Sequence, residues 1–221
     1  MIEIKKILYN LKDNKRIIFI LLILLGVKIF FVNYNNINNN SYLYLLGEDY
    51  KRYTTMFDFT YNALLDFILL FISMKIFNRG LRKNAEFIFL RKSKFKYVID
   101  EFKNIFLVKS LIISILSGLI FLFVKNANVN IQDVIKVILF KSVLDMILIT
   151  MNVMIGELYF ISYIILYNIP IHLTMFNIRK YFECFFADYY NIFNLLIIFL
   201  IAIFLLAKIA SKGIIKYVNR Q

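Results

Sequence analysis

The sequence predicts an all-α polytopic membrane protein with about six transmembrane helices. Of its 221 residues, 61% are hydrophobic, and the mean hydropathy is +0.72. Soluble proteins contain about 45–50% apolar residues, so a water-soluble fold of this size could not hide this much apolar surface. Six apolar stretches also approach the roughly 17–25 residues that cross a bilayer. These stretches are Ile17–Val32, Met56–Phe77, Ile105–Val124, Val134–Ile155, Leu158–Met175 and Ile192–Ile209.

The basic residues predict how these spans are oriented. The chain has 27 Lys and Arg against 14 Asp and Glu, a formal net charge of +13. Lys and Arg concentrate on the cytoplasmic side of membrane proteins. With six spans and an internal N-terminus, the cytoplasmic segments hold Lys5, Lys6, Lys12, Lys15, Arg16, Arg79, Arg82, Lys83, Arg91, Lys92, Lys94, Lys96, Lys103, Lys212, Lys216 and Arg220. The external segments hold only Lys51, Arg52, Lys125, Arg179 and Lys180.

This distribution predicts a multi-pass protein of the cell membrane with both termini in the cytoplasm. Basic loops beside apolar spans face anionic lipid headgroups, which accounts for the positive charge without a nucleic-acid partner. No soluble domain and no internal repeat fits between the spans. We therefore expect residues 1–221 to form a single transmembrane domain.

The first sixteen residues are expected to remain part of the protein. Their charged region is too long for a signal peptide, and no small-residue cleavage site follows the apolar run. Ile4, Ile7, Leu8 and Leu11 recur at helical spacing, with most lysines on the other face. This pattern predicts an amphipathic helix on the inner membrane surface, and a disordered basic leader is the alternative.

The residue inventory excludes most catalytic chemistry. One Cys rules out a disulfide framework and a multi-Cys metal site, and one His argues against a His-based zinc site. The six Gly residues are scattered, so no phosphate-binding loop is present. His172 lacks a supporting catalytic motif, and Cys184 is interpreted as a packing residue or a free thiol. We expect no catalytic residues, no metal and no cofactor in this chain, and no enzymatic activity of its own.

Polar and ionisable residues inside the spans are more informative. They are Asp58, Asn62, Asp66, Lys109, Lys141 and Asp145. Charged groups at membrane depth are costly, so they usually face the bundle interior and find partners. Lys141 and Asp145 are four residues apart and can pair on one face, and Asp66 could pair with Lys141 or Lys109. Either these residues line a substrate path or they hold the helices together.

The region after the only proline, Pro170, is rich in aromatic residues. Proline tends to break or kink a helix, so the aromatic stretch Ile171–Tyr190 could form a hairpin that dips into the outer leaflet. An ordinary aromatic belt at the membrane interface is the alternative interpretation.

The connection between the second and third spans, Asn78–Asn104, is the most distinctive segment. Asn84 can cap a short helix over Ala85–Leu90, with Glu86 in its first turn. Ser93 can cap a second helix that runs on into the third span. Apolar residues of the short helix, Phe87 and Phe89 among them, could insert into a groove on a cytoplasmic partner. A solvated basic loop whose apolar residues rest on lipid is the alternative.

This connection resembles the coupling helix in membrane subunits of ABC-2-type transporters, in which an acidic residue precedes basic residues and a serine. The matching positions are Glu86, Arg91, Lys92, Ser93 and Lys103. The resemblance implies a small six-span permease with an N-terminal interfacial helix. It assigns coupling to a cytoplasmic ATP-binding subunit to Glu86, Phe87, Phe89, Arg91, Lys92 and Ser93. ATP and Mg would be bound by that subunit.

The resemblance also implies pairing with a second permease copy or a related permease. Its implied cargo is a hydrophobic or amphipathic peptide, of the bacteriocin or toxin class that small members of the family export or confer immunity against. Two other functions stay open at this stage. One is an ion-gradient-driven transporter that uses Asp58, Asp66 and Asp145. The other is a membrane immunity or assembly protein that transports nothing.

Overall fold

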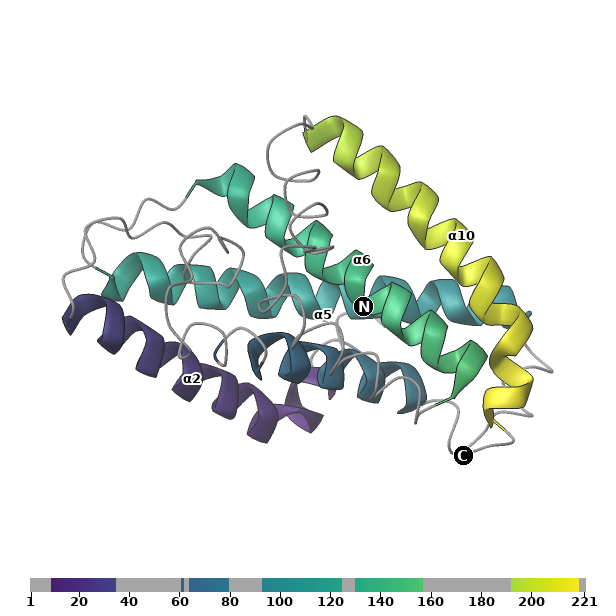
Figure 1. Cartoon of the computed structure of the whole chain (residues 1–221), viewed down its shortest axis with the longest axis horizontal. Helices are drawn as coiled ribbons and strands as arrows, with labels where there is room; N and C mark the ends of the chain where they lie inside the picture. The colour runs from purple at the N-terminus through teal and green to yellow at the C-terminus, as the bar shows by residue number, and fades with distance from the viewer. Residues whose placement is uncertain are drawn as a thin grey trace, which may run out of the picture.

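The computed structural model of the chain is a bundle of α-helices (Figure 1). The structure describes residues 9–34, 61, 64–79, 93–124, 130–156 and 192–218. The long helices are α2 (Lys15–Tyr34), α5 (Lys94–Phe123), α6 (Ile131–Ile155) and α10 (Ile192–Val218). Residues 9–13 and 64–79 are also helical, and no strand occurs within the described ranges. The predicted all-α class is confirmed for this part of the chain.

Within the described residues, three helices are long and apolar enough to cross a membrane: Lys15–Tyr34, Lys94–Phe123 and Phe193–Ile215. The bundle also exposes large apolar side chains, such as Phe30 and Leu122, which are 71% and 72% accessible. The interior of the bundle is mainly apolar and also holds charged side chains such as Lys109 and Asp145. So many exposed large apolar side chains fit a helical bundle surrounded by lipid, because soluble proteins rarely leave extended apolar patches facing water.

The predicted spans correspond to helices with different ends. Ile17–Val32 lies within α2, and Val134–Ile155 lies within α6. Met56–Phe77 is helical from residue 64 onward in the described part of the chain. The fifth predicted span, Leu158–Met175, lies outside the described residues, as does the aromatic stretch after Pro170.

Helices α5 and α10 are longer than the apolar stretches that predicted them. Helix α5 begins at Lys94 rather than at Ile105, and α10 ends at Val218 rather than at Ile209. A hydropathy pattern detects the part of a helix that needs lipid, whereas backbone hydrogen bonding continues into the polar region beyond it. Ser93 caps α5 as predicted, and its side chain accepts a hydrogen bond of 3.3 Å from the Lys96 amide.

Contacts near the helix ends show in which direction each helix runs. The Lys75 ammonium lies 3.2 Å from the Asp13 carboxylate, so residues 64–79 end where α2 begins. The Tyr97 hydroxyl donates a 3.0 Å hydrogen bond to the Phe77 carbonyl, so α5 begins at that end too. Helices α2 and α5 therefore run in one direction, and residues 64–79 run in the other.

Helices α6 and α10 run in the same direction as residues 64–79. The Tyr217 hydroxyl, near the end of α10, donates to Asn78 Oδ1 (2.8 Å) and accepts from Asn152 Nδ2 (3.3 Å) near the end of α6. At the opposite end, Asn33 Nδ2 of α2 donates to the Phe123 carbonyl of α5 at 2.9 Å. The first and third predicted spans thus run one way, and the second, fourth and sixth run the other.

We call the end where α2 and α5 begin the basic end of the bundle. The segments predicted to share the cytoplasmic side bring their described cations together there. These cations are Lys12, Lys15, Arg16, Arg79, Lys94, Lys96, Lys103 and Lys212, and Lys75 of the second predicted span lies at the same end, beside Asp13. The charge asymmetry of the sequence therefore becomes an asymmetry between the two ends of one bundle.

The N-terminal helix is held against the end of residues 64–79. Asn14 forms a turn between residues 9–13 and α2, and its side-chain amide donates to the Asn10 carbonyl at 2.8 Å. The Arg79 guanidinium lies 3.4 Å from the centroid of the Tyr9 ring and donates to Asn10 Oδ1. These contacts attach the N-terminal segment to the basic end, and the earlier residues of the predicted interfacial helix lie outside the described part.

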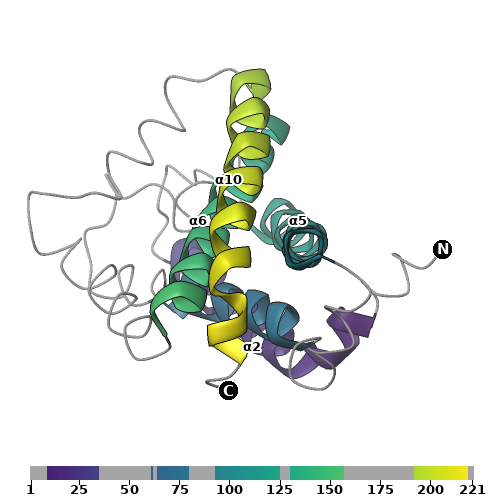
Figure 2. The ribbon, with the colours of Figure 1, turned by 90° about the vertical axis from the view of Figure 1, so that its right-hand side faces the viewer.

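Helix α10 packs closely on α6 and also contacts α5 (Figure 2). The two helices α10 and α6 come close together at Gly213. A Cβ placed on Gly213 would lie 2.7 Å from Met154 Sδ, 3.1 Å from the Val153 carbonyl and 3.3 Å from Val153 Cγ1. The absence of a side chain at this position therefore lets the ends of the two helices meet.

We expect Gly213→Leu to lower the free energy of unfolding by about 1–3 kcal/mol, because the new side chain must displace the α6 backbone. The measurement is thermal denaturation of the purified protein in detergent. Gly118→Leu is the matched control, since no atom of the described residues would lie within 4 Å of a Cβ placed on Gly118. Equal melting temperatures for the two variants would show that the close helix approach is not required.

Candidate functional site

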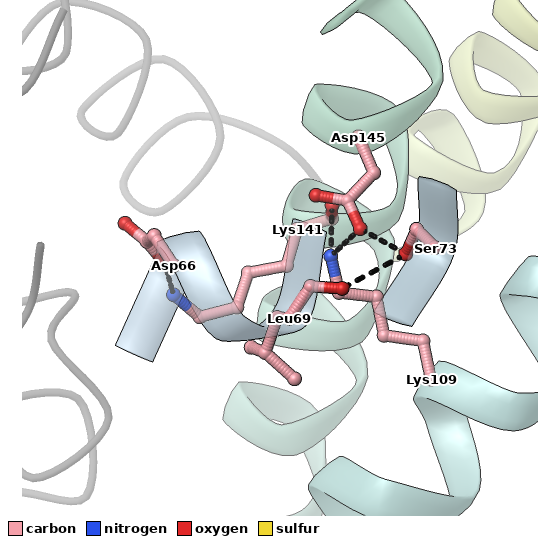
Figure 3. Close-up of polar contacts among 6 residues, drawn as sticks. All are labelled: Asp66, Leu69, Ser73, Lys109, Lys141 and Asp145. Atoms are coloured by element: carbon pink, nitrogen blue, oxygen red, sulfur yellow. Dashed lines mark hydrogen bonds and ion pairs between the residues drawn. The ribbon is translucent and has the colours of Figure 1, made fainter. Parts of the chain in front are cut away.

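Four charged residues meet in the bundle interior, and we call them the buried quartet: Asp66, Lys109, Lys141 and Asp145 (Figure 3). Asp66 belongs to residues 64–79, Lys109 to α5, and Lys141 and Asp145 to α6. Lys109, Lys141 and Asp145 are only 2–3% accessible. All four were predicted from the sequence as interior residues of the spans, and the structure brings them together.

Two ion pairs connect the members of the quartet. Lys141 Nζ lies 2.7 Å from Asp66 Oδ1, and Lys109 Nζ lies 2.5 Å from Asp145 Oδ2. The Lys109 ammonium also donates a 2.7 Å hydrogen bond to the main-chain carbonyl of Lys141. The ion pairs therefore join α6 to residues 64–79 on one side and to α5 on the other. Of the two partners expected for Asp66, the structure selects Lys141.

Ser73 completes the site, and it was not identified from the sequence. Its hydroxyl hydrogen-bonds the Asp145 carboxylate and also lies 3.1 Å from the Leu69 carbonyl (Figure 3). Ser73 follows Asp66 by seven residues, which is two helical turns and therefore the same face. This spacing was a usable signal, but a serine inside an apolar stretch is a weak one, because it more often bonds its own helix.

The quartet lies near the middle of α5 and α6. Lys109 is about 22 Å from Lys94 and about 21 Å from Phe123 along α5, at 1.5 Å per residue. Charges at such depth in a bilayer are retained only where they are paired. The two lysines and two aspartates cancel in formal charge, and their ion pairs offset the cost of removing them from water. The quartet can hold three helical segments together, and its charges can be redistributed among alternative partners.

A second polar cluster lies closer to the basic end. Tyr217, Asn78 and Asn152 form the hydrogen-bonded chain described above, and Tyr217 is 1% accessible. Near the start of α5, Asn104 Nδ2 donates to Glu101 Oε2 at 3.3 Å, with both residues buried. No role was predicted for these residues from the sequence. Their hydrogen bonds satisfy polar groups that would otherwise be costly to bury.

A further buried cation, Lys28, lies in α2. Its side chain is fully buried, and its ammonium is 5.2 Å from the centroid of the Tyr61 ring. An aromatic face attracts a cation, and the attraction grows when both groups are desolvated. Lys28 was also missed from the sequence. A single lysine in an apolar stretch is readily interpreted as one whose ammonium extends to the membrane surface.

Several predicted site residues lie outside the described part of the chain. Asp58 and Asn62 are two of them, and the others are the predicted coupling residues Glu86, Phe87, Phe89, Arg91 and Lys92. Ser93 is described, as the N-cap of α5. Within the described ranges, no group of three or more His, Cys, Asp or Glu side chains could hold a metal ion.

Comparisons of the chain with protein-family models, with curated proteins and with solved structures found no match.

Proposed function

We propose that this chain is the membrane-spanning subunit of an ATP-driven exporter of the ABC-2 type. The observation that carries the proposal is the continuity of α5. It is one unbroken 30-residue helix, about 45 Å long, that begins directly after the predicted coupling segment. It therefore links that segment at the basic end to Lys109 in the buried quartet.

The helix directions support a six-span topology for this subunit. Helix α6 ends at the basic end, whereas α10 begins at the opposite end and returns to the basic end. Residues 157–191 therefore connect the basic end to the opposite end. A fifth span at Leu158–Met175 would make that passage and leave both termini on the cytoplasmic side.

The proposed partners follow from the same topology and from the family resemblance. A cytoplasmic subunit binds ATP and Mg and acts on Glu86–Ser93, while a second permease copy or a related permease completes the membrane part. The cations of the basic end face anionic lipid. The proposed cargo is a hydrophobic or amphipathic peptide, an assignment that rests on the family resemblance.

The proposal predicts that reversing the charges of the coupling segment uncouples the ATPase. The chain is co-purified with its proposed ATP-binding subunit, and ATP turnover is measured in vesicles. We expect Glu86→Lys with Arg91→Glu to abolish the stimulated turnover, because both charges that contact the partner change sign. The matched control is Asp13→Lys with Lys75→Glu, which exchanges an exposed ion pair at the same end of the bundle and keeps it paired.

Retained stimulation in the Glu86 and Arg91 variant would overturn the coupling role.

An ion-gradient-driven transporter is the second candidate, and the mid-depth position of the buried quartet favours it. Peptide flux that persists in ATP-depleted vesicles and collapses with the proton gradient would select that function. Peptide binding without any ATPase partner would instead indicate an immunity or assembly protein.

A further inference from the structure

The two ion pairs of the buried quartet lie at two levels along the bundle. Asp145 follows Lys141 by four residues on α6, a rise of about 6 Å toward the basic end. On residues 64–79, Ser73 lies two helical turns nearer to the basic end than Asp66 does. The pair of Lys109 with Asp145 is therefore closer to the basic end, and the pair of Lys141 with Asp66 is farther from it.

We propose that the quartet is a partner-exchange switch with two positions. In the observed position Lys109 binds Asp145 and Lys141 binds Asp66. In the second position α5 has moved about one helical turn away from the basic end. Lys109 then binds Asp66, and Lys141 turns toward Asp145 on its own helix. This inference deepens the proposed function and rests on it only for the force that moves α5.

Charge balance makes both positions favourable. Each lysine keeps an aspartate partner before and after the exchange, and Lys141 and Asp145 have the four-residue spacing at which oppositely charged side chains pair on one helix. At the midpoint of the movement, Lys109 would have left Asp145 without yet reaching Asp66. An unpaired charge is costly at membrane depth. A packed interface with two favourable positions and a costly midpoint shifts in discrete steps of about one turn.

Contacts within the site are compatible with the movement. Lys109 lies next to the helix that carries both Lys141 and Asp145, and it is paired with Asp145. Its ammonium also donates to the main-chain carbonyl of Lys141, the residue whose side chain forms the other ion pair. Asp145 keeps its hydrogen bond to Ser73 in either position, because Ser73 lies on residues 64–79 rather than on α5.

The direction of the movement fits a push from the basic end. Helix α5 begins there at Lys94, and Asp66 is farther from that end than Asp145 is. A force on the Ser93 end along the helix axis therefore moves Lys109 away from Asp145 and toward Asp66. The quartet would convert a displacement at the membrane surface into a discrete rearrangement at its centre.

Exchanging the charges of one pair tests the switch. In Lys109→Asp with Asp145→Lys, the observed position keeps two opposite-charge pairs. The second position would place like charges together at both levels, so this variant should remain in the observed position, and we call it locked. Asp66→Lys with Lys141→Asp should be locked for the same reason. The variant that combines all four substitutions restores opposite charges in both positions and should switch again.

The measurement is the distance between spin labels on α5 and α6 in the full-length chain. The labels are carried by Lys103→Cys and Ile155→Cys, both exposed, in a chain with Cys184→Ser. We expect two distance populations about 5 Å apart in the otherwise unaltered chain, since one turn separates the positions. The second population should fall at least about tenfold in either locked variant and return in the fourfold variant.

Two populations in a locked variant, or one population in the unaltered chain both alone and with its ATPase, would overturn the switch. If one locked variant does not elute as a single species on purification, the measurement is made on the other locked variant. Failure of the proposed function looks different, because two interconverting populations would then persist while the ATPase shows no stimulation.

Discussion

Asp145→Asn is expected to lower the free energy of unfolding by about 3–5 kcal/mol, because it leaves the buried Lys109 ammonium without its anionic partner. Asp145 is 3% accessible and binds both Lys109 and Ser73, so water has little access to the site of the lost charge. The measurement is denaturation in mixed detergent micelles, followed by helical circular dichroism. Asp133→Asn, in the first turn of the same helix and only partly buried, is the control and should change stability by less than about 1 kcal/mol.

A compensating variant separates the charge effect from a packing effect. Lys109→Met with Asp145→Leu removes both charges and keeps apolar volume, so it should recover most of the lost stability. Ser73 keeps its contact with the Leu69 carbonyl in that background. If Asp145→Asn were as stable as the parent chain, the ion pair with Lys109 would not contribute to stability.

Labelling a cysteine at Ser93 should give an all-or-none result for the topology. In a chain with Cys184→Ser, an impermeant thiol reagent applied to intact cells should leave Ser93→Cys unmodified, because Ser93 lies at the basic end that we place inside. The same reagent should modify Asn130→Cys, since Asn130 is an exposed residue that caps α6 at the opposite end. Labelling is followed as a mass shift on a gel, before and after the cells are opened.

Both sites are N-cap residues, so the two variants have comparable local costs. Rapid modification of Ser93→Cys from outside would show that the bundle has the opposite orientation. It would also place the predicted coupling segment where no cytoplasmic ATPase could reach it, and the proposed function would fail with it.

Local patterns in the sequence were sufficient for the helices and for part of the site. Ser93 was recognisable as a cap because a serine there precedes a helical apolar pattern, and the structure confirms the hydrogen bond to Lys96. Lys109, Lys141 and Asp145 were recognisable because charges are rare in apolar spans. In contrast, Ser73 and Tyr217 were missed because their residue types are common at such positions and become informative only when a distant partner is known.

By itself, the sequence therefore determined the all-α class of the described part, the apolar stretches of its helices and the end of the bundle at which the basic residues gather. These properties depend on hydropathy, spacing and charge, which are local along the chain. Only the tertiary structure decided which lysine binds which aspartate: Lys141 with Asp66 and Lys109 with Asp145. That choice depends on how α5, α6 and residues 64–79 are staggered along the bundle axis, and the stagger is set by packing between helices far apart in the sequence.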